Sequence, residues 1–514
     1  MAEDVVPKRK LIDRFLDFVE RNGNRLPDPI TMFAGLAILV ILLSAIFAAF
    51  GVSVTHPSDG KIIEVQSLLT QQNIRRIFTE MVKNFSSFHP LGIVLVAIIG
   101  IGVAERSGYI GAALRKLVTS VPKSMLSATL VFAGVMSNLA ADAGYVILTP
   151  LGAMLFAAFG RHPIAGLAAA FAGVSGGFSA NLLVTSLDPL LGGITTTSAQ
   201  LLDKSYTVQA TANYYFMFVS TFLLTAVGTW ITDKVVEPRL GVWNPSEANI
   251  KIDNKAGELT DKERKGLKYA NLTLLVSVGL CLFLALPQNA ILRDDTGNLK
   301  PFYDSLIPII MLVFLFAGVV YGLFAGTIKN DKDVSRMASE QMATMGAYIV
   351  LAFAAAQFIS YFSWSNFGLV IAVTGADLLK SLGISGIPLL ISFIIVTAFI
   401  NLFIGSASAK WAVMGPVFVP MFMIMGYSPE LIQNTYRVGD SVTNIISPLL
   451  PYFPIIIAFS KKYSPKVGLG TLISVMIPYS AWFFVMWSLL LGVWYLFGIP
   501  LGPDAPMHYT PPTP

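Results

Sequence analysis

Long apolar stretches recur along the whole chain, and they constrain its fold more than any other feature. They cover residues 30–52, 90–104, 124–139, 145–159, 164–183, 214–232, 267–286, 307–327, 348 onwards, 384–404, 411–426, 445–459 and 471–497. Only 13% of the 514 residues are charged, whereas soluble proteins carry about 25%. Because this deficit extends over the whole chain, we predict an all-α polytopic membrane protein.

Lysine and arginine clusters predict the orientation of the chain, because cytoplasmic loops carry an excess of these residues. The clusters lie at residues 8–10, 115–123, 234–268, 329–336 and 461–466, and the C-terminal tail has none. We therefore expect a cytoplasmic N-terminus and an external C-terminus. The net charge of +5 lies in these loops and gives no indication of a nucleic-acid partner.

The apolar stretches cannot all cross the membrane, since some basic loops would then lie on the wrong side. All the basic loops lie on the cytoplasmic side if four segments enter the membrane and turn back within it. These segments are near residues 124–139, 165–194, 384–404 and 431–457. About nine transmembrane helices then remain. Backbone unwinds at membrane depth only where it is buried in protein or lines water, so these four breaks are expected to surround the site.

An internal repeat supports the same architecture. Three positions recur at a constant offset of 266, and Asn181 matches Asn444 at an offset of 263; the three pairs are Pro150 and Pro416, Gly160 and Gly426, and Pro163 and Pro429. The first set follows a cytoplasmic loop and the second an external one. We therefore predict inverted repeats, with two re-entrant helical hairpins and broken helices, as in secondary transporters.

Five segments follow from this organisation. We expect a cytoplasmic amphipathic helix that contacts lipid, a first repeat with one hairpin, a cytoplasmic linker, a second repeat with the other hairpin and an external tail. Their bounds are residues 1–28, 29–236, 237–266, 267–498 and 499–514.

Polar clusters fall at the four breaks. They comprise 137–144 with Asp142, 176–189 with Asn181 and Asp188, 401–411, and 434–448. Glycine and serine let a helix stop, and the freed carbonyls become cation ligands. Asn401 lies one turn before Gly405, and Asn444 comes from the facing break, so these oxygens form a candidate sodium site. The alternative is that the asparagines only cap broken helix ends.

Ionisable residues inside a membrane are costly and therefore indicate function. Arg437 and Asp440 are three residues apart and are expected to pair on one helical face. The pair either fixes the broken helix or binds an anionic solute with Ser408 and Trp411. Lys410 either joins this site or extends to the membrane surface.

Two other classes of protein compete with a transporter. An intramembrane enzyme needs a nucleophile or a general base, but the four histidines lie in loops or at membrane edges and Cys281 stands alone. No motif of a serine hydrolase or zinc protease occurs, so no catalytic residue and no cofactor is assigned. A channel remains an alternative, although paired hairpins favour alternating access.

Several long motifs resemble the p-aminobenzoyl-glutamate transporter (AbgT) family. They include "GRHPIAGLAAAFAGVSGGFSANLL", "ITDKVVEPRLG", "LPQNAILRD", "GSASAKWAVMGPVFVPMFMIMGYSPE" and "YRVGDSVTNIISPLLPYFP". The resemblance implies a homodimer in the bacterial inner membrane, each protomer with nine spanning helices and two hairpins. It implies import of p-aminobenzoyl-glutamate or export of sulfonamide drugs, with sodium or a proton as the coupling ion.

The resemblance also implies functional residues. The motif matching "SLDPLL" assigns a role in transport to Asp188, and "GSASAKW" assigns roles to Ser408 and Trp411. The remaining assignments come from "YSPE" and from "YRVGDSVTNIISP", and they are Pro429, Arg437, Asp440 and Pro448. A sodium site in the family is similar to the Asn401, Gly405 and Asn444 cluster.

Overall fold

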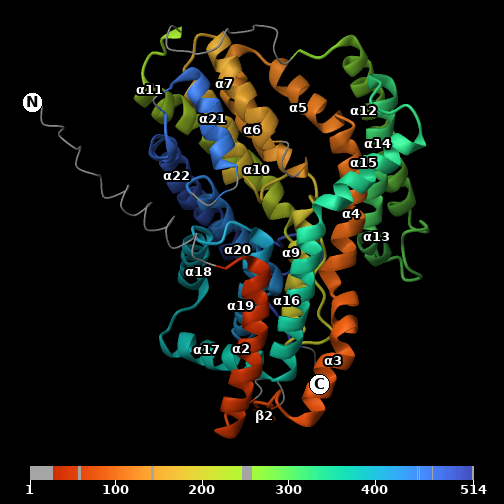
Figure 1. Ribbon diagram of the computed structural model, residues 1–514, viewed down its shortest axis with the longest axis vertical. Coiled ribbons are helices and arrows are strands. Elements are labelled where there is room, and N and C mark those ends of the chain that lie inside the picture. Colours follow the sequence, from red (N-terminus) through yellow and green to blue (C-terminus); the bar gives the residue numbers. More distant parts are fainter. Residues whose placement is uncertain are drawn as a thin grey trace, which may run out of the picture.

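The computed structural model describes residues 27–55, 60–140, 144–245, 258–447, 450, 452–465 and 467–511. The predicted N-terminal amphipathic helix therefore lies almost entirely outside the described residues. The same holds for Asp142, for Pro448 and for much of the predicted linker. Figure 1 shows an elongated molecule built from helices, with the C-terminal segment at the bottom of the view.

In the described part of the chain, the first half forms ten α-helices. They are α2 (Pro29–Ala49), α3 (Gln71–Ser86), α4 (His89–Arg106), α5 (Tyr109–Thr119), α6 (Leu126–Ser137), α7 (Thr149–Ala158), α8 (Pro163–Phe171), α9 (Leu187–Ala199), α10 (Tyr214–Ile231) and α11 (Glu237–Leu240). Short 3-10 turns are η1 (Lys123–Met125) and η2 (Asn138–Ala140), and π-helical turns are η3 (Gly144–Leu148), η4 (Ala172–Gly176) and η5 (Thr232–Val236). Two antiparallel strands, β1 (Ser53–Thr55) and β2 (Ile62–Glu64), follow α2.

The described residues of the second half form eleven α-helices. They are α12 (Asp261–Ala285), α13 (Lys300–Asp304), α14 (Leu306–Ala325), α15 (Asp331–Thr344), α16 (Gly346–Trp364), α17 (Phe367–Ser381), α18 (Gly386–Asn401), α19 (Ala407–Ile424), α20 (Pro429–Asn444), α21 (Phe453–Tyr463) and α22 (Leu469–Leu496).

The number of membrane-crossing helices agrees with the sequence prediction. Among the described residues, eight helices are long and apolar enough to cross a membrane, or nine if the bent α5–α6 pair counts as one span. Three shorter apolar helical segments, Gly144–Ala158, Pro163–Gly176 and Gly386–Asn401, lie at or beside the predicted breaks. The fold is thus an all-α polytopic membrane protein with broken helices.

Two helical hairpins end in the same kind of turn. α7 and α8 are joined at Gly160, and α19 and α20 at Gly426, with φ angles of +71° and +90°. In each hairpin the amide of the residue after the glycine bonds back five residues, Arg161 N to Phe156 O at 2.8 Å in the first. This is the Schellman arrangement, in which glycine adopts the left-handed conformation that ends a helix.

The two hairpin turns lie at opposite ends of the molecule. The first turn is tied to α11, because Arg161 forms an ion pair with Glu237. The second is tied to the C-terminal segment, where Tyr509 N donates to Gly426 O at 3.0 Å. Figure 1 shows α11 at the top and the C-terminus at the bottom. The two turns, which hold the repeated residues Gly160 and Gly426, are therefore inverted relative to each other, as the repeat predicted.

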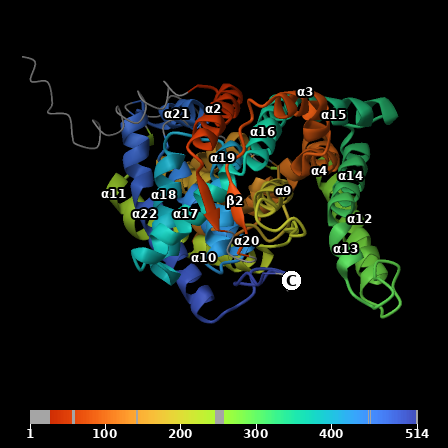
Figure 2. The same ribbon diagram turned by 90° about the horizontal axis from the view of Figure 1, so that it is seen from below.

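Helix α20 lies at the centre of the protein although it is rich in polar residues. Every residue of α20 except Thr443 is buried. The helix packs against α9, α18, α19 and α22, and Figure 2 shows it inside a ring of helices. A Cβ on Gly439 would lie 2.7 Å from Ile394 O, so this glycine lets α20 approach the α18 backbone closely.

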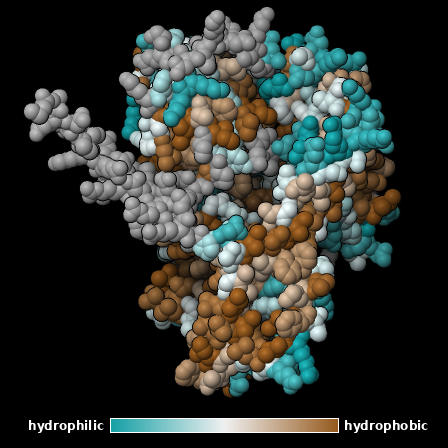
Figure 3. Space-filling model, viewed as in Figure 1, coloured by the Kyte–Doolittle hydropathy of each residue, from teal (hydrophilic) through white to brown (hydrophobic). Residues whose placement is uncertain are grey.

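Other helices present apolar side chains outward. On α2, Ile38, Leu42 and Ile46 are 59%, 50% and 50% exposed. Figure 3 shows apolar surface over much of the lower half of this face and a hydrophilic surface at the upper right. Apolar exposure on this scale is expected of helices that contact lipid.

Candidate functional site

The four predicted breaks line one cavity of about 390 Å³, which we call the inner cavity. Asn138 directly follows α6, and Phe178 and Ser186 come from the unwound segment between η4 and α9. The third and fourth breaks contribute Gly405, Ser406, Ser408, Asn444 and Leu450. Ser408, Gly405 and Asn444, singled out from the sequence, thus lie together at one cavity.

Two long helices begin at the wall of the inner cavity. α9 starts at Leu187 and α19 at Ala407, and both residues line the cavity. Ser406 caps α19, accepting a hydrogen bond from Ala409 N at 3.3 Å. The amide groups at a helix N-terminus carry partial positive charge and favour anions. The inner cavity therefore has two positive helix ends, one from each repeat.

An aromatic pair forms another wall of the inner cavity. The rings of Tyr145 and Tyr452 stack with their centroids 4.0 Å apart and an angle of 8° between their planes, and both line the cavity. Tyr145 comes from η3 and Tyr452 from the turn before α21. Neither tyrosine was predicted as a site residue, because neither belongs to a polar cluster or a periodic pattern.

The buried ion pairs differ from the pairing predicted from sequence. Arg437 does not pair with Asp440; its Nη1 donates to Asp188 Oδ1 at 2.6 Å and its Nη2 to Ser179 O at 3.0 Å. The prediction was wrong because it considered only neighbours on one helix, whereas the packing of α20 brings Arg437 to α9. Asp188 also accepts hydrogen bonds from both the amide and the hydroxyl of Thr185.

Asn181 lies beside this ion pair. It lines a very small void with Asp188 and Arg437, and its amide bonds to Val135 O at 3.1 Å. Among the described residues, buried Arg437 Nε and Ser179 Oγ find no protein partner. Buried polar groups without a protein partner normally bind water or a ligand. The region between the repeats therefore has unused hydrogen-bonding capacity.

Lys410 is fully buried and does not extend to the membrane surface. Its Nζ lies 2.5 Å from Asp440 Oδ1, donates to Asn401 Oδ1 and reaches Ile404 O at 3.4 Å. Asn401 in turn donates to Asn444 Oδ1 at 2.8 Å. The lysine ammonium thus contacts Asn401, one of the three residues of the predicted sodium site.

Trp411 is buried and does not line the inner cavity. Its ring stacks on Tyr436 with centroids 4.4 Å apart, and its Nε1 donates to Thr195 Oγ1 of α9 at 2.8 Å. The Thr195 hydroxyl is also 2.6 Å from Gln433 Oε1 of α20. In this arrangement Trp411 joins α19, α9 and α20, so its indole acts as a packing element between the repeats.

Pro429 occupies the first turn of α20, at the end next to the C-terminal segment. There Ser428 N donates to Met507 O at 3.2 Å. Pro429 is therefore remote from the inner cavity, and its fixed φ angle suits the start of a helix. In the described part of the chain, no group of three or more His, Cys, Asp or Glu side chains is placed to hold a metal.

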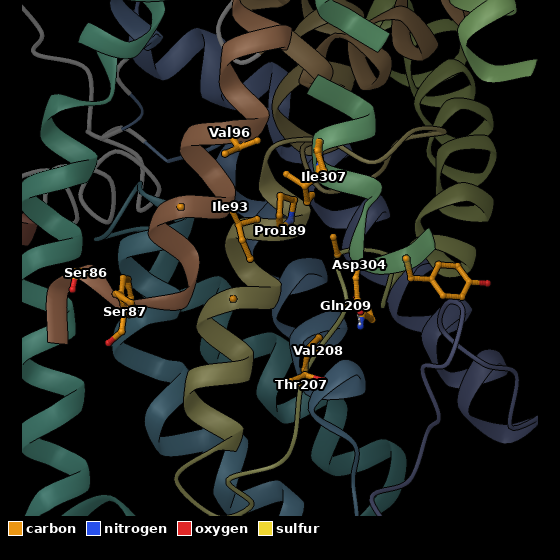
Figure 4. A pocket seen from close by; sticks show the side chains of 16 residues that line it. Ser86, Ser87, Ile93, Val96, Pro189, Thr207, Val208, Gln209, Asp304 and Ile307 are labelled. Atoms are coloured by element: carbon orange, nitrogen blue, oxygen red, sulfur yellow. Dashed lines mark hydrogen bonds between the residues drawn. The ribbon is translucent and has the colours of Figure 1, made fainter. Parts of the chain in front are cut away.

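A second cavity of about 790 Å³, the outer cavity, lies on the other side of α4 and α9. Figure 4 shows Ile93 and Val96 of α4, Pro189 of α9 and the loop from Thr207 to Gln209 around it. The end of α3, at Ser86 and Ser87, and the helices α13 and α14 also line it. Gln209 Nε2 donates to Asp304 Oδ1 at 3.1 Å and closes part of the rim.

The two cavities are separated by the contact between α4 and α9. On α9, Leu190 faces the inner cavity, whereas Gly193 faces the outer one. A Cβ on Gly193 would lie 2.9 Å from Pro90 Cγ and 3.0 Å from Pro90 Cα. The absence of a side chain at Gly193 therefore allows the two helices to touch and form the barrier.

Comparison with known proteins agrees with these features. The model of the AbgT putative transporter family matches residues 14–509. The p-aminobenzoyl-glutamate transport protein of Escherichia coli K12 is 39% identical over 506 residues, covering 98% of this chain and 99% of that protein.

Two solved structures have the same fold. The YdaH transporter of Alcanivorax borkumensis superposes with a TM-score of 0.88 at 45% identity, covering 93% of this chain and 100% of that one. MtrF of Neisseria gonorrhoeae, described as one of a class of antimetabolite efflux pumps, gives 0.91 at 46% identity, with coverages of 96% and 100%. This chain belongs to the AbgT transporter family and is a multi-pass membrane transport protein, not an enzyme.

Proposed function

We propose that this protein is an ion-coupled secondary transporter of aromatic carboxylates of the p-aminobenzoyl-glutamate type, and that the inner cavity binds the solute. The observation that carries this proposal is the convergence of two helix N-termini and one stacked tyrosine pair on a single cavity. The Escherichia coli relative is a p-aminobenzoyl-glutamate transport protein, which supports the same class of solute.

The chemistry of such a solute matches the walls of the inner cavity. Its glutamate part carries two carboxylates, and the cavity offers the N-termini of α9 and α19 with the Ser406 and Ser408 hydroxyls. Helix N-termini at the membrane midplane serve anionic substrates in this way in other transporters. Its aminobenzoyl ring can stack against Tyr145 or Tyr452, as aromatic pairs prefer offset or edge contacts.

The arrangement of the cavities supports alternating access. Arg437 and Asp188 join the two repeats, and Lys410 and Asp440 join α19 to α20. Each pair carries no net charge. A solute or ion that changes the charge of one partner therefore shifts the equilibrium between two arrangements of the helices. We assign the roles in transport to Asp188, Arg437, Asp440 and the residues of the inner cavity, with sodium or a proton as the coupling ion.

Export of sulfonamide antimetabolites is a second candidate function. The observation that favours it is the similarity to MtrF, whose description concerns antimetabolite efflux. Sulfonamides carry the same aminophenyl ring as p-aminobenzoyl compounds but lack the two glutamate carboxylates. The tyrosine pair serves both solutes, whereas the helix N-termini favour the dicarboxylate.

We further propose that the protein works as a homodimer in the bacterial inner membrane, in contact with lipid, with its N-terminus in the cytoplasm and its C-terminus outside. The basic loops support this orientation. They include Lys116, Lys262 and Lys265, which lie near the α5 and α12 ends at the top of Figure 1. We also propose that the chain is organised in the five segments expected from the sequence, with boundaries at residues 28, 236, 266 and 498.

The test is uptake and counterflow of labelled p-aminobenzoyl-glutamate in proteoliposomes, with sodium and proton gradients imposed separately. The proposal expects saturable counterflow and accumulation driven by one of the two gradients. A sulfonamide that exchanges with label, while p-aminobenzoyl-glutamate does not, would favour the export function. No exchange with either solute would contradict both functions.

A further inference from the structure

Two polar atoms in the wall of the inner cavity are buried and, within the described residues, have no hydrogen-bond partner. They are Oδ1 of Asn138, directly after α6, and the hydroxyl oxygen of Tyr348, on α16. Both residues line the inner cavity, and Asn138 is only 7% exposed. Leaving such a group unpaired costs its desolvation, so buried polar groups of this kind normally bind water or a ligand.

The other contacts of Asn138 fix the orientation of its amide. Nδ2 donates to Val135 O at 3.1 Å and to Gly177 O at 3.4 Å. Both partners are main-chain carbonyls, which only accept, so turning the amide over would place Oδ1 against two acceptors. The unpartnered atom of Asn138 is therefore the amide oxygen, and it can only accept a hydrogen bond.

The partner that Asn138 lacks is a donor. A carboxylate is an acceptor only and would be repelled by Oδ1, whereas the Tyr348 hydroxyl can both donate and accept. A primary aromatic amine carries two N–H donors and is uncharged at neutral pH, so it needs no buried counter-ion. The two unpartnered oxygens therefore match the amine end of an aminobenzoyl solute and not its glutamate end.

The carboxylates of the same solute have other partners in the inner cavity. The N-termini of α9 and α19, which begin at Leu187 and Ala407, favour anions. These helices differ from the elements that carry Asn138 and Tyr348, which are η2 and α16. The two ends of the solute thus have separate sets of protein groups with opposite hydrogen-bonding character.

We propose that Asn138 Oδ1 and the Tyr348 hydroxyl bind the aromatic amine of the solute and orient the solute in the inner cavity. The amine donates one hydrogen bond to each oxygen, while the carboxylates lie toward the helix N-termini. Both candidate solutes, p-aminobenzoyl-glutamate and sulfonamides, carry this amine, so the same two residues serve both. The assignment rests on the proposed function and adds the residues that select an arylamine.

Binding of matched solutes to the purified protein in detergent tests this assignment without requiring transport. Labelled p-aminobenzoyl-glutamate is displaced by the unlabelled compound or by benzoyl-glutamate, which lacks only the amine. Benzoyl-glutamate leaves both oxygens without a donor, so its Kd for the wild type is expected to be about five- to fiftyfold higher. The N,N-dimethyl derivative keeps the nitrogen but has no N–H, and it should bind no better than benzoyl-glutamate.

Variants of the two residues are compared through the ratio of the Kd for benzoyl-glutamate to the Kd for p-aminobenzoyl-glutamate. Tyr348→Phe removes a hydroxyl without a partner among the described residues, and it should lower this ratio about threefold. Asn138→Leu should bring the ratio close to one. Tyr361→Phe, on the same helix but outside the inner cavity, is the matched control and should keep the wild-type ratio.

The ratio separates recognition of the amine from a structural role. Local damage at the end of α6 would weaken both solutes together and leave the ratio unchanged. Equal Kd values for the two solutes in the wild type would overturn the assignment, as would a wild-type ratio in both Tyr348→Phe and Asn138→Leu. If Asn138→Leu does not fold, the solute series on the wild type and on Tyr348→Phe decides the question.

Counterflow by the same protein in proteoliposomes tests the proposed function separately. Counterflow of p-aminobenzoyl-glutamate with a ratio of one would support transport and overturn the assignment. A high wild-type ratio that falls in both variants, without counterflow, would contradict transport and leave the assignment in place. Sulfanilamide and benzenesulfonamide differ by the same amine and extend the test to the second candidate solute. Failure of all these compounds to bind would overturn both proposals.

Discussion

Arg437 of α20 and Asp188 of α9 form a buried ion pair between the two repeats, with their Nη1 and Oδ1 atoms 2.6 Å apart. The two residues are separated by 249 positions in sequence. Asp188 also accepts hydrogen bonds from Thr185, so its carboxylate is held by its own segment as well as by the arginine. Each repeat contributes one buried charge, which would have no partner without the other repeat. The relative position of the repeats therefore depends on this pair.

Removing one partner of this pair is expected to destabilise the protein. Arg437→Met leaves the Asp188 carboxylate buried without its cation, at a cost of about 3–5 kcal/mol. The double variant Arg437→Met with Asp188→Asn removes both charges and should recover most of that loss. The measurement is the free energy of unfolding in a double-mutant cycle.

An exposed pair provides the control for this cycle. Arg336 and Asp333 lie one turn apart on α15, 2.9 Å between Nη2 and Oδ1, and the arginine side chain is 60% exposed. Arg336→Met should change stability by no more than about 1 kcal/mol. Equal losses from Arg437→Met and Arg336→Met would show that the buried pair does not hold the repeats together.

The tyrosine pair is expected to set affinity for the aromatic part of the solute. Tyr452→Ala removes one ring from the stack with Tyr145, which should cost about 0.5–1.5 kcal/mol of binding, or roughly a two- to tenfold rise in KM. Tyr452→Phe keeps the ring and should keep KM. Competition between labelled and unlabelled solute in proteoliposomes measures the effect, and equal KM values for both variants would exclude the ring from the binding site.

The helix cap at the inner cavity is expected to affect carboxylate binding. Ser406→Ala removes the cap of α19, where Ser406 accepts from Ala409 N, and should cost about 1 kcal/mol of stability. It should also raise KM for the dicarboxylate more than for a sulfonamide. Thr70→Ala removes the comparable cap of α3, whose partner is Asn73 N at 3.3 Å. An equal rise in KM in both variants would place the anion elsewhere.

Much of the fold could be predicted from the sequence because its signals are local. Apolar stretches gave the helical membrane fold, and repeated residues such as Pro163 and Pro429 gave the inverted hairpins. The turns at Gly160 and Gly426 have the predicted correspondence because both need a left-handed residue. The strands β1 and β2 were missed because three-residue strands leave no periodic pattern.

The site was predicted less completely because its contacts join distant helices. The four breaks were expected to surround the site, and residues from all four line one cavity. The partner of Arg437 was wrong, since spacing along α20 points to Asp440 and only tertiary packing brings Asp188 into reach. The burial of Lys410 beside Asp440 likewise depends on how α19 meets α20. The sequence alone did not decide whether Lys410 joins the site or extends to the membrane surface.

The barrier between the cavities is expected to depend on Gly193. Gly193→Ala places a Cβ about 3 Å from Pro90. The Pro90 ring is bonded to the backbone at two points and cannot move aside easily. The α4–α9 contact should therefore loosen, and transport should fall or become uncoupled from the ion gradient.

The matched control for this variant is Gly279→Ala on α12, where a Cβ meets nothing within 4 Å. It should leave transport unchanged. Uptake and passive leak of labelled solute are measured in the same vesicles. Normal coupled uptake by Gly193→Ala would show that this contact is not the barrier.

Alternating access is the central claim, and accessibility of the two cavities from the two sides of the membrane tests it most directly. Single cysteines at Ile93, in the outer cavity, and Ala407, in the inner cavity, are introduced after Cys281→Ser and labelled with an impermeant thiol reagent from each side. A ligand shifts a two-state equilibrium only through different affinities for the two states. We expect p-aminobenzoyl-glutamate or the coupling ion to change the two labelling rates in opposite directions. Equal labelling of both cysteines from one side, unchanged by any ligand, would contradict the account and indicate a static pore.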